Sequence, residues 1–288
     1  MGLKEVKWVY LIGLALIWGS SFILIKKGLI GLTAIQLGSL RIIFAALFLL
    51  LIGFKSLAKI PQRQWKFIAL TSFFGTFTPA YLFAIAETEI DSSITAILNS
   101  LTPLNTLVIG VFIFGMQSQR RQIFGVFIGL VGCLLLVFNG AMSHPEQNYY
   151  YAILVVVASL CYAINVNLIK KYLSDLSSLS ITTGNFMVLL IPAIVILSFS
   201  GFHEVMYDEK AQYSIFFIVV LGVVGTGIAN VLFFKLIQMS SPVFATSVTY
   251  LIPIIAFFWG FLDNEMLTPI QLLGAFIVLV GVYLSAKK

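Results

Sequence analysis

Long runs of apolar residues follow one another along almost the whole chain, and they constrain the fold more than any other feature. A helix needs about 20 residues to cross the hydrocarbon core of a bilayer. Windows of roughly 17 to 25 residues predict ten such spans. They cover residues 7–26, 33–54, 65–86, 92–115, 122–139, 149–169, 179–200, 213–236, 241–262 and 269–286. The stretches between them are too short to bury a core of their own.

The composition supports this interpretation. The chain is 60% hydrophobic and only 10% charged, whereas soluble domains are about half apolar and a quarter charged. We therefore predict an all-α integral membrane protein in contact with the lipid bilayer. The first run follows Lys4 and Lys7 and lacks a clear small-residue cleavage site, so we interpret it as a retained helix. Cys133 and Cys161 lie inside apolar runs and predict neither a disulfide framework nor a metal site.

Basic residues fall mainly on one side of the predicted membrane. Of the seventeen lysines and arginines, thirteen lie on the side of the N-terminus, three lie on the opposite side and Arg41 lies within a span. The thirteen are Lys4, Lys7, Lys55, Lys59, Arg63, Lys66, Arg120, Arg121, Lys170, Lys171, Lys235, Lys287 and Lys288. Cytoplasmic loops carry an excess of lysine and arginine. Both termini are therefore predicted to be cytoplasmic.

The second half of the chain repeats the plan of the first. Gln122 to Gly132 is echoed by Gln271 to Gly281, with seven of eleven positions identical. Pro103 matches Pro253, and Gly75-Thr76 matches Gly225-Thr226, both at an offset of 150 (253 − 103 and 225 − 75). Ile25-Lys26-Lys27 likewise matches Ile169-Lys170-Lys171. We predict two five-helix repeats, residues 1–139 and 140–288. Because five is odd, the second repeat must cross the membrane in the opposite sense to the first.

Residues 92–115 form an uncharged span whose first half is polar. Six polar side chains accompany Pro103, which removes a backbone donor: Thr95, Asn99, Ser100, Thr102, Asn105 and Thr106. Polar groups and broken hydrogen bonds are tolerated at membrane depth only where they face protein or a watery cavity. Inverted repeats place a substrate site near the midplane, at the interface between the repeats. The pattern therefore predicts a transporter that works by alternating access around a central cavity.

Several motifs resemble those of the drug/metabolite transporter superfamily, in particular its EamA branch of ten-span carriers. Trp18-Gly19-Ser20-Ser21-Phe22 is similar to the WGSxF motif of that family's first helix. Arg41, the segment from Thr95 to Pro103 and the segment from Glu265 to Gly281 resemble further family motifs. The resemblance implies export of a small metabolite, such as an amino acid, across the inner membrane of a bacterium. Met116-Gln117 departs from the family's Gly-Glu, which leaves a gating or structural acid only at Glu265.

Arg41 is the one charged residue within a predicted span. An arginine at this depth costs about 2.5 to 3.5 kcal/mol on insertion scales, so it must be paired, hydrated or functional. Its planar fork suits a substrate's carboxylate or phosphate. A structural clamp on neighbouring carbonyls, or an extension towards Glu87, Glu89 or Asp91 at the outer surface, explains it equally well.

Amides and aromatic residues inside the spans supply the other candidates. Buried amides need partners, so each should face the interior of the bundle. Asn105, Asn167 and Asn185 are interpreted as hydrogen-bonding links between helices. Tyrosine and tryptophan placed deep in a membrane also need a polar partner, which a cavity supplies. The predicted substrate-binding residues are Trp18, Ser21, Arg41, Tyr81, Asn99, Asn165, Asn230 and Tyr250.

Prolines and glycines suggest where the bundle bends and where it packs closely. Pro79, Pro103 and Pro253 interrupt backbone hydrogen bonds and are candidate gating positions, although fixed kinks explain them equally well. Gly125 and Gly129 form a GxxxG pair. We assign this pair to close packing within the bundle rather than to dimerisation, and therefore favour a monomer.

The remaining patterns narrow the class of protein. All eleven carboxylates lie in loops or at span ends, so none is placed mid-membrane to carry a proton or to neutralise a cationic drug. We therefore predict facilitated or exchange-like transport of a neutral, zwitterionic or anionic metabolite. The chain lacks HExxH, GxSxG and Walker motifs, so neither an enzyme nor a cofactor is expected. Nucleic-acid binding is not expected either, because topology explains the basic residues. A channel and a structural subunit are the alternatives.

Overall fold

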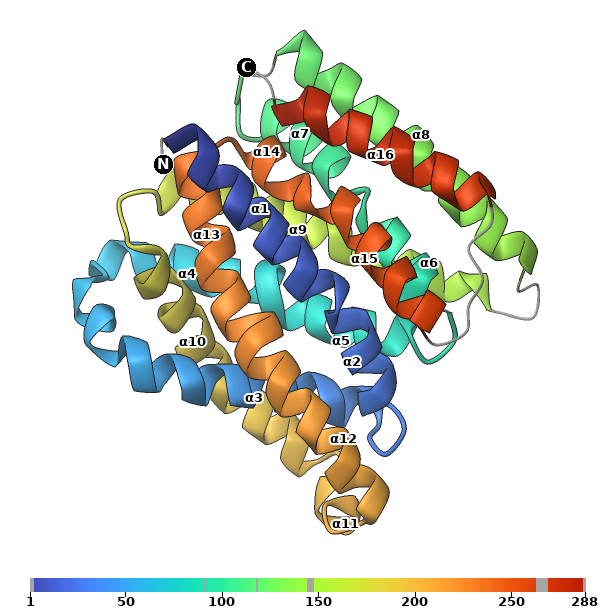
Figure 1. The fold of residues 1–288 in the computed structure, drawn as a ribbon. Helices are drawn as coiled ribbons and strands as arrows, with labels where there is room; N and C mark the ends of the chain where they lie inside the picture. The colour runs from blue at the N-terminus through green and yellow to red at the C-terminus, as the bar shows by residue number, and fades with distance from the viewer. Residues whose placement is uncertain (1–2, 91, 118, 144–147, 263–268, 287–288) are drawn as a thin grey trace.

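The chain folds into a bundle of helices (Figure 1). The computed structural model describes residues 3–90, 92–117, 119–143, 148–262 and 269–286, and no strand occurs among them. The α-helices are α1 (Leu3–Gly19), α2 (Ser21–Gly28), α3 (Ala34–Gly53), α4 (Trp65–Ser72), α5 (Thr78–Ala86), α6 (Ser92–Asn99), α7 (Thr102–Phe112), α8 (Arg120–Ser143), α9 (Ala152–Tyr172), α10 (Ser178–Ser198), α11 (Phe202–Val205), α12 (Glu209–Val220), α13 (Ala229–Met239), α14 (Pro242–Thr246), α15 (Val248–Leu262) and α16 (Pro269–Ala286). The all-helical prediction is confirmed for these residues.

Eight stretches of the described residues are long and apolar enough to cross a membrane as helices. They are Glu5–Gly28, Ala34–Lys59, Gln62–Ala86, Thr95–Phe112, Ala152–Tyr172, Ser178–Ser198, Glu209–Met239 and Pro242–Trp259. Each coincides with a predicted span. The other two predicted spans, 122–139 and 269–286, fall on α8 and α16.

The outside of the bundle is apolar, as a lipid-facing surface must be. Leu51 of α3, Phe112 of α7 and Phe138 of α8 are 85%, 84% and 66% exposed. Soluble monomers rarely expose large contiguous apolar patches. In a bilayer the same side chains contact lipid, while the backbone polar groups are satisfied inside the helices.

Two long spans are interrupted by π-helical turns at related positions. Segment η3 (Phe73–Phe77) joins α4 to α5, and segment η5 (Leu221–Ile228) joins α12 to α13. The first contains Gly75-Thr76 and the second contains Gly225-Thr226, the pair that repeats in the sequence. A π turn changes the backbone hydrogen-bonding pattern and often marks a functional site.

Two further spans break into half-helices. Helices α6 and α7 meet at Ser100 and Leu101, and α14 and α15 meet at Ser247. Pro103 lies in the first turn of α7, where its missing N–H needs no partner. The two breaks touch, because Ser100 Oγ donates a hydrogen bond to the carbonyl of Thr249 at 2.7 Å. Both interruptions therefore lie together inside the bundle.

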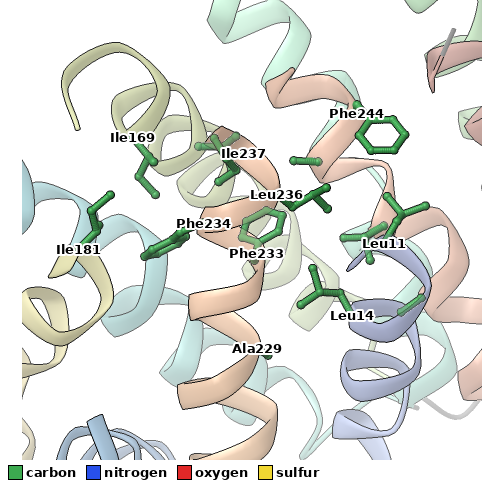
Figure 2. Packing of buried hydrophobic residues seen from close by; sticks show 14 of the residues in the cluster. Leu11, Leu14, Ile169, Ile181, Ala229, Phe233, Phe234, Leu236, Ile237 and Phe244 are labelled. Atoms are coloured by element: carbon green, nitrogen blue, oxygen red, sulfur yellow. The ribbon is translucent and has the colours of Figure 1, made fainter. Parts of the chain in front are cut away.

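A dense apolar cluster fills the bundle next to these breaks. In Figure 2, Phe234 of α13 points towards Ile169 and Ile181, while Phe233 lies on the side of Leu14. The C-terminal end of α13 is fixed by Lys170, whose Nζ donates to the carbonyls of Ile237, Gln238 and Ser240 at 3.1, 3.3 and 2.7 Å. A cation at a helix C-terminus also interacts favourably with the helix dipole. Lys170 thus links the end of α9 to the end of α13.

Helices α8 and α16 pack along each other (Figure 1). A Cβ atom on Gly281 would lie 2.5 Å from the backbone nitrogen of Gly129 and 2.8 Å from the carbonyl oxygen of Gly125. Only glycine allows this approach, because the neighbouring atoms are backbone and cannot rotate away. Gly125 and Gly129 thus pack against a helix of the same chain.

Gly281→Ala is expected to destabilise the fold. Overpacking of this kind typically costs about 1 to 3 kcal/mol, and thermal unfolding in detergent should show a lower midpoint. Gly13→Ala is the matched control, because a Cβ atom on Gly13 of α1 meets nothing within 4 Å. Equal midpoints for the two variants would contradict the close packing.

Candidate functional site

A cavity lies between the two halves of the chain, beside the interrupted helices. The cavity has a volume of about 80 Å³. A single water needs only about 10 to 15 Å³. Its polar lining consists of Ser21, Arg41, Thr76, Asn99, Thr102, Tyr162, Asn165, Thr226, Asn230, Thr246 and Thr249. Its apolar lining consists of Trp18, Phe22, Ile25, Gly75, Ala80, Phe83, Phe233 and Ile252. The space therefore suits a small organic molecule with at least one polar group.

Arg41 reaches the cavity from α3 and is held by the opposite half of the chain. Its Nε donates a hydrogen bond to Thr226 Oγ1 at 2.7 Å. The Thr226 hydroxyl in turn donates to the carbonyl of Leu221 at 3.0 Å, five residues earlier within the π turn. Among the described residues, the two terminal nitrogens of Arg41 have no hydrogen-bond partner. The guanidinium is thus fixed at one nitrogen and keeps donors for a ligand.

Two of the amides that line the cavity are Asn165 and Asn99. Asn165 of α9 packs against Gly75, and its buried Oδ1 has no hydrogen-bond partner among the described residues. Asn99, at the end of α6, accepts a hydrogen bond from Thr102 at its backbone carbonyl, at 2.6 Å. Buried polar groups normally have partners. The oxygen of Asn165 is therefore an acceptor in the cavity wall that the described residues leave unsatisfied.

Asn230, Ser21 and Trp18 line the cavity but use their donors within the protein. Asn230 Nδ2 donates to the carbonyl of Thr226 at 2.9 Å, and Ser21 Oγ donates to the carbonyl of Ile17 at 2.9 Å. Trp18 Nε1 donates to the carbonyl of Gly225, also at 2.9 Å. This last bond satisfies a carbonyl in the π turn η5. Because its only N–H is used in this bond, the Trp18 ring presents an apolar surface to the cavity.

Aromatic rings form much of that wall. Trp18 meets Phe233 edge to face, with ring centroids 4.9 Å apart. Phe83 contacts both Phe22 and Tyr162, at centroid distances of 6.1 and 5.9 Å. Aromatic pairs of this kind are favourable by about 0.5 to 1.5 kcal/mol beyond the area that they bury. The cavity thus combines a fixed aromatic surface with one cation and several amides.

Tyr81 and Tyr250 are not among the lining residues. The Tyr81 hydroxyl is hydrogen-bonded to Ser39 Oγ at 2.9 Å. Tyr250 is fully buried beneath α8, where its hydroxyl donates to the carbonyl of Val126 at 3.3 Å and its ring packs against Gly129. The hydroxyl groups of both tyrosines are therefore hydrogen-bonded to protein groups outside the cavity lining.

The three candidate gating prolines are also outside the lining. Pro79 lies in the first turn of α5, directly after η3, and Pro103 lies in the first turn of α7. Helix α15 continues through Pro253, and the interruption of that span lies at Ser247. The breaks thus lie beside the prolines rather than at them. Glu265 lies outside the described residues.

The other three amides link helices, as their expected role requires. Asn105 Nδ2 donates to Ser159 Oγ at 2.8 Å, and Asn167 Nδ2 donates to the carbonyl of Thr106 at 3.1 Å. Asn185 is hydrogen-bonded to the Thr71 hydroxyl at 2.9 Å. Among the described residues, no group of three or more histidine, cysteine or acidic side chains is arranged to hold a metal ion.

Glu87 is a residue whose environment the sequence pattern did not reveal. It follows α5 directly, outside the candidate span Gln62–Ala86. Its Oε2 accepts a hydrogen bond from Ser92 Oγ at 2.9 Å, while its buried Oε1 has no partner among the described residues. Burial raises the pKa of Glu87 to about 8, although the Ser92 hydrogen bond and the charges of Arg41 and Lys26 act against that shift. Glu87 thus lies at the end of a span, as predicted, but its surroundings favour the protonated form.

Thr226 and Tyr162 also belong to the site but were not predicted as binding residues. The signal for Thr226 was present, because Gly225-Thr226 repeats Gly75-Thr76. Tyr162 is an aromatic residue within a candidate span, as Tyr81 and Tyr250 are. Periodicity does not separate these three, since their helices are apolar on nearly every side.

Comparison with known protein families decides the identity of the chain. The model of the EamA-like transporter family matches it twice, over residues 7–138 and 150–287. The chain belongs to the EamA-like transporter family. It is thus a transporter of the drug/metabolite superfamily, as the motifs around Trp18 and Arg41 indicated.

Relatives of this EamA-type protein cover nearly all of its length. An uncharacterized transporter from Bacillus subtilis, YoaV, is 24% identical over 96% of this chain and 94% of its own. The uncharacterized inner membrane transporter YedA of Escherichia coli is 26% identical over 95% of this chain and 88% of its own. A probable amino-acid metabolite efflux pump of Escherichia coli is 24% identical over 93% of this chain and 91% of its own. A crystal structure with 11% sequence identity shares the fold, with a TM-score of 0.74 over 98% of this chain and 96% of the other.

Proposed function

We propose that this EamA-type transporter exports a small carboxylate-bearing metabolite, such as an amino acid, by alternating access around the cavity. One observation carries the proposal: Arg41 is anchored through Nε and keeps its terminal donors for a ligand. Arginine recognises carboxylates in a two-pronged geometry. The aromatic wall provides a surface for the rest of the molecule. The name of the Escherichia coli relative, a probable amino-acid metabolite efflux pump, supports this substrate class.

We infer that the architecture is ten spans in two inverted five-helix repeats, residues 1–139 and 140–288. The π turns η3 and η5 and the helix breaks at Ser100 and Ser247 support it, because each feature recurs at a related place in the other half. The Ser100 to Thr249 hydrogen bond joins the two halves at these breaks. Transporters with inverted repeats bind substrate at such discontinuous helices near the midplane.

The orientation belongs to the same proposal. The start of α1 and the end of α16 lie at the same end of the bundle (Figure 1), which fits an even number of crossings. With the basic residues concentrated on that side, we place both termini in the cytoplasm of a bacterium. The relative named as an inner membrane transporter supports an inner-membrane location. We expect a monomer, because Gly125 and Gly129 already pack against Gly281 of the same chain and not against a second copy.

A two-step experiment tests this function. A thermal-shift screen of carboxylate-bearing metabolites on purified protein should find ligands that raise the midpoint, because binding to the folded state stabilises it. In proteoliposomes preloaded with such a ligand, the labelled compound should then accumulate transiently by counterflow. Empty liposomes are the control. Single-channel currents without saturable counterflow would indicate a pore and overturn the carrier proposal.

A further inference from the structure

The cation of the cavity, Arg41, and the half-buried acid Glu87 are not paired. Arg41 and Glu87 lie close enough for their charges to interact. Within the part of the chain that the structure describes, however, they form no ion pair. Arg41 is bonded to Thr226, and Glu87 is bonded to Ser92. Each therefore keeps polar atoms that the other does not satisfy.

The surroundings of Glu87 favour its neutral form. An ionised carboxylate accepts hydrogen bonds at both oxygens, but the buried Oε1 has none among the described residues. Leaving such a charge unsatisfied is costly. When Glu87 carries a proton, the charge of Arg41 is uncompensated and attracts an anion. When Glu87 is ionised, it repels an incoming carboxylate.

We propose that the Arg41 site takes up a carboxylate together with a proton on Glu87, so that a monoanionic substrate and the proton bind as an electroneutral pair. The inference rests on the proposed function, because it assumes that Arg41 binds the substrate's carboxylate. The proton passes from water to a Glu87 oxygen, and no bond of the substrate changes. Export of a monoanion is then driven by the combined gradients of substrate and proton and moves no net charge, whereas a zwitterionic amino acid would carry the charge of the proton.

The charged groups around Glu87 set the direction of this coupling. Arg41 on α3 and Lys26 on α2 favour the ionised form, as does the hydrogen bond from Ser92 on α6. Glu89 lies on the same turn and is exposed to solvent. An anion that neutralises Arg41 weakens one of these opposing influences, and Glu87 then holds its proton more tightly. By thermodynamic reciprocity, a proton on Glu87 strengthens anion binding to the same extent.

Infrared titration of the purified full-length protein tests the coupling. The band of protonated carboxyl groups should lose intensity as the pH rises through about 8, and this component should be missing in Glu87→Gln. The probe 3-phenylpropionate should raise the midpoint by about one pH unit, which corresponds to about tenfold linkage. Its neutral analogue 3-phenylpropionamide should leave the midpoint unchanged. Glu89→Gln is the matched control, because Glu89 is an exposed acid two residues away.

Binding measured by tryptophan fluorescence, to which Trp18 contributes, gives a second readout. Wild-type affinity for 3-phenylpropionate should fall about tenfold as Glu87 ionises with rising pH, and Glu87→Gln should bind tightly at every pH. If the probe binds without changing the Glu87 midpoint, the coupling is wrong and the transporter proposal stands. If no carboxylate binds and counterflow also fails, the proposed function fails and the inference fails with it. If Glu87→Gln does not fold, the wild-type protein still tests the coupling. In that protein 3-phenylpropionate should raise the Glu87 midpoint and 3-phenylpropionamide should not.

Discussion

Replacing Arg41 with glutamine is expected to weaken carboxylate binding about a hundredfold and to reduce counterflow accordingly. Glutamine keeps part of the side chain's reach but loses the charge and the paired donors that face the cavity. Hydrogen bonds to charged groups contribute about 1.5 to 3 kcal/mol each, so losing them corresponds to about 3 kcal/mol of binding free energy. Equilibrium binding of 3-phenylpropionate and counterflow in proteoliposomes measure the two effects.

Two further measurements separate a binding role for Arg41 from a structural one. Arg63→Gln is the matched control, because Arg63 is exposed in a connection and lies outside the cavity. It should bind and transport like wild type. If Arg41→Gln transports normally but unfolds at a lower temperature, then Arg41 is a clamp between α3 and η5. Arg41→Lys should rescue only part of the affinity, because lysine keeps the charge without the planar fork.

The candidate spans could be predicted from the sequence because a membrane-spanning helix needs about 20 apolar residues, and the apolar runs of this chain have that length. The predicted span 33–54 corresponds to Ala34–Lys59, and the predicted span 179–200 corresponds to Ser178–Ser198. Arg41 was accessible for a related reason, since a charge among apolar residues requires an explanation. Polar groups in lipid-facing helices are costly, so the few that occur are informative.

The sequence did not show which aromatic side chains face the cavity. Tyr81, Tyr162 and Tyr250 all lie within candidate spans, but only Tyr162 lines the cavity. The helices that carry them meet lipid on one side and apolar neighbours on the other, so their sequences lack the polar face that orients a helix in a soluble protein. The raised pKa of Glu87 was hidden too, because it depends on how the folded chain shields this side chain from water, which the apolar windows do not show.

Gly75→Ala is the second substitution with a large expected effect. A methyl group at this position would overlap the amide of Asn165. The Asn165 side chain must then turn away, and its unpaired oxygen leaves its place in the cavity wall. We expect affinity and counterflow to fall about tenfold, the usual consequence of losing one well-placed hydrogen bond. Fluorescence titration with 3-phenylpropionate and counterflow in proteoliposomes provide the measurement.

A double-mutant cycle identifies the cause of that loss. Asn165→Ala removes the amide, so adding Gly75→Ala to it should cost nothing more. If the two substitutions acted independently, their losses of binding free energy would add, as they do for sites without shared contacts. Gly13→Ala again serves as the control, because the added methyl group meets open space. Additive losses in the cycle would mean that Gly75 acts on the π turn η3 itself, and Asn165 would then lose its place as a ligand-binding residue.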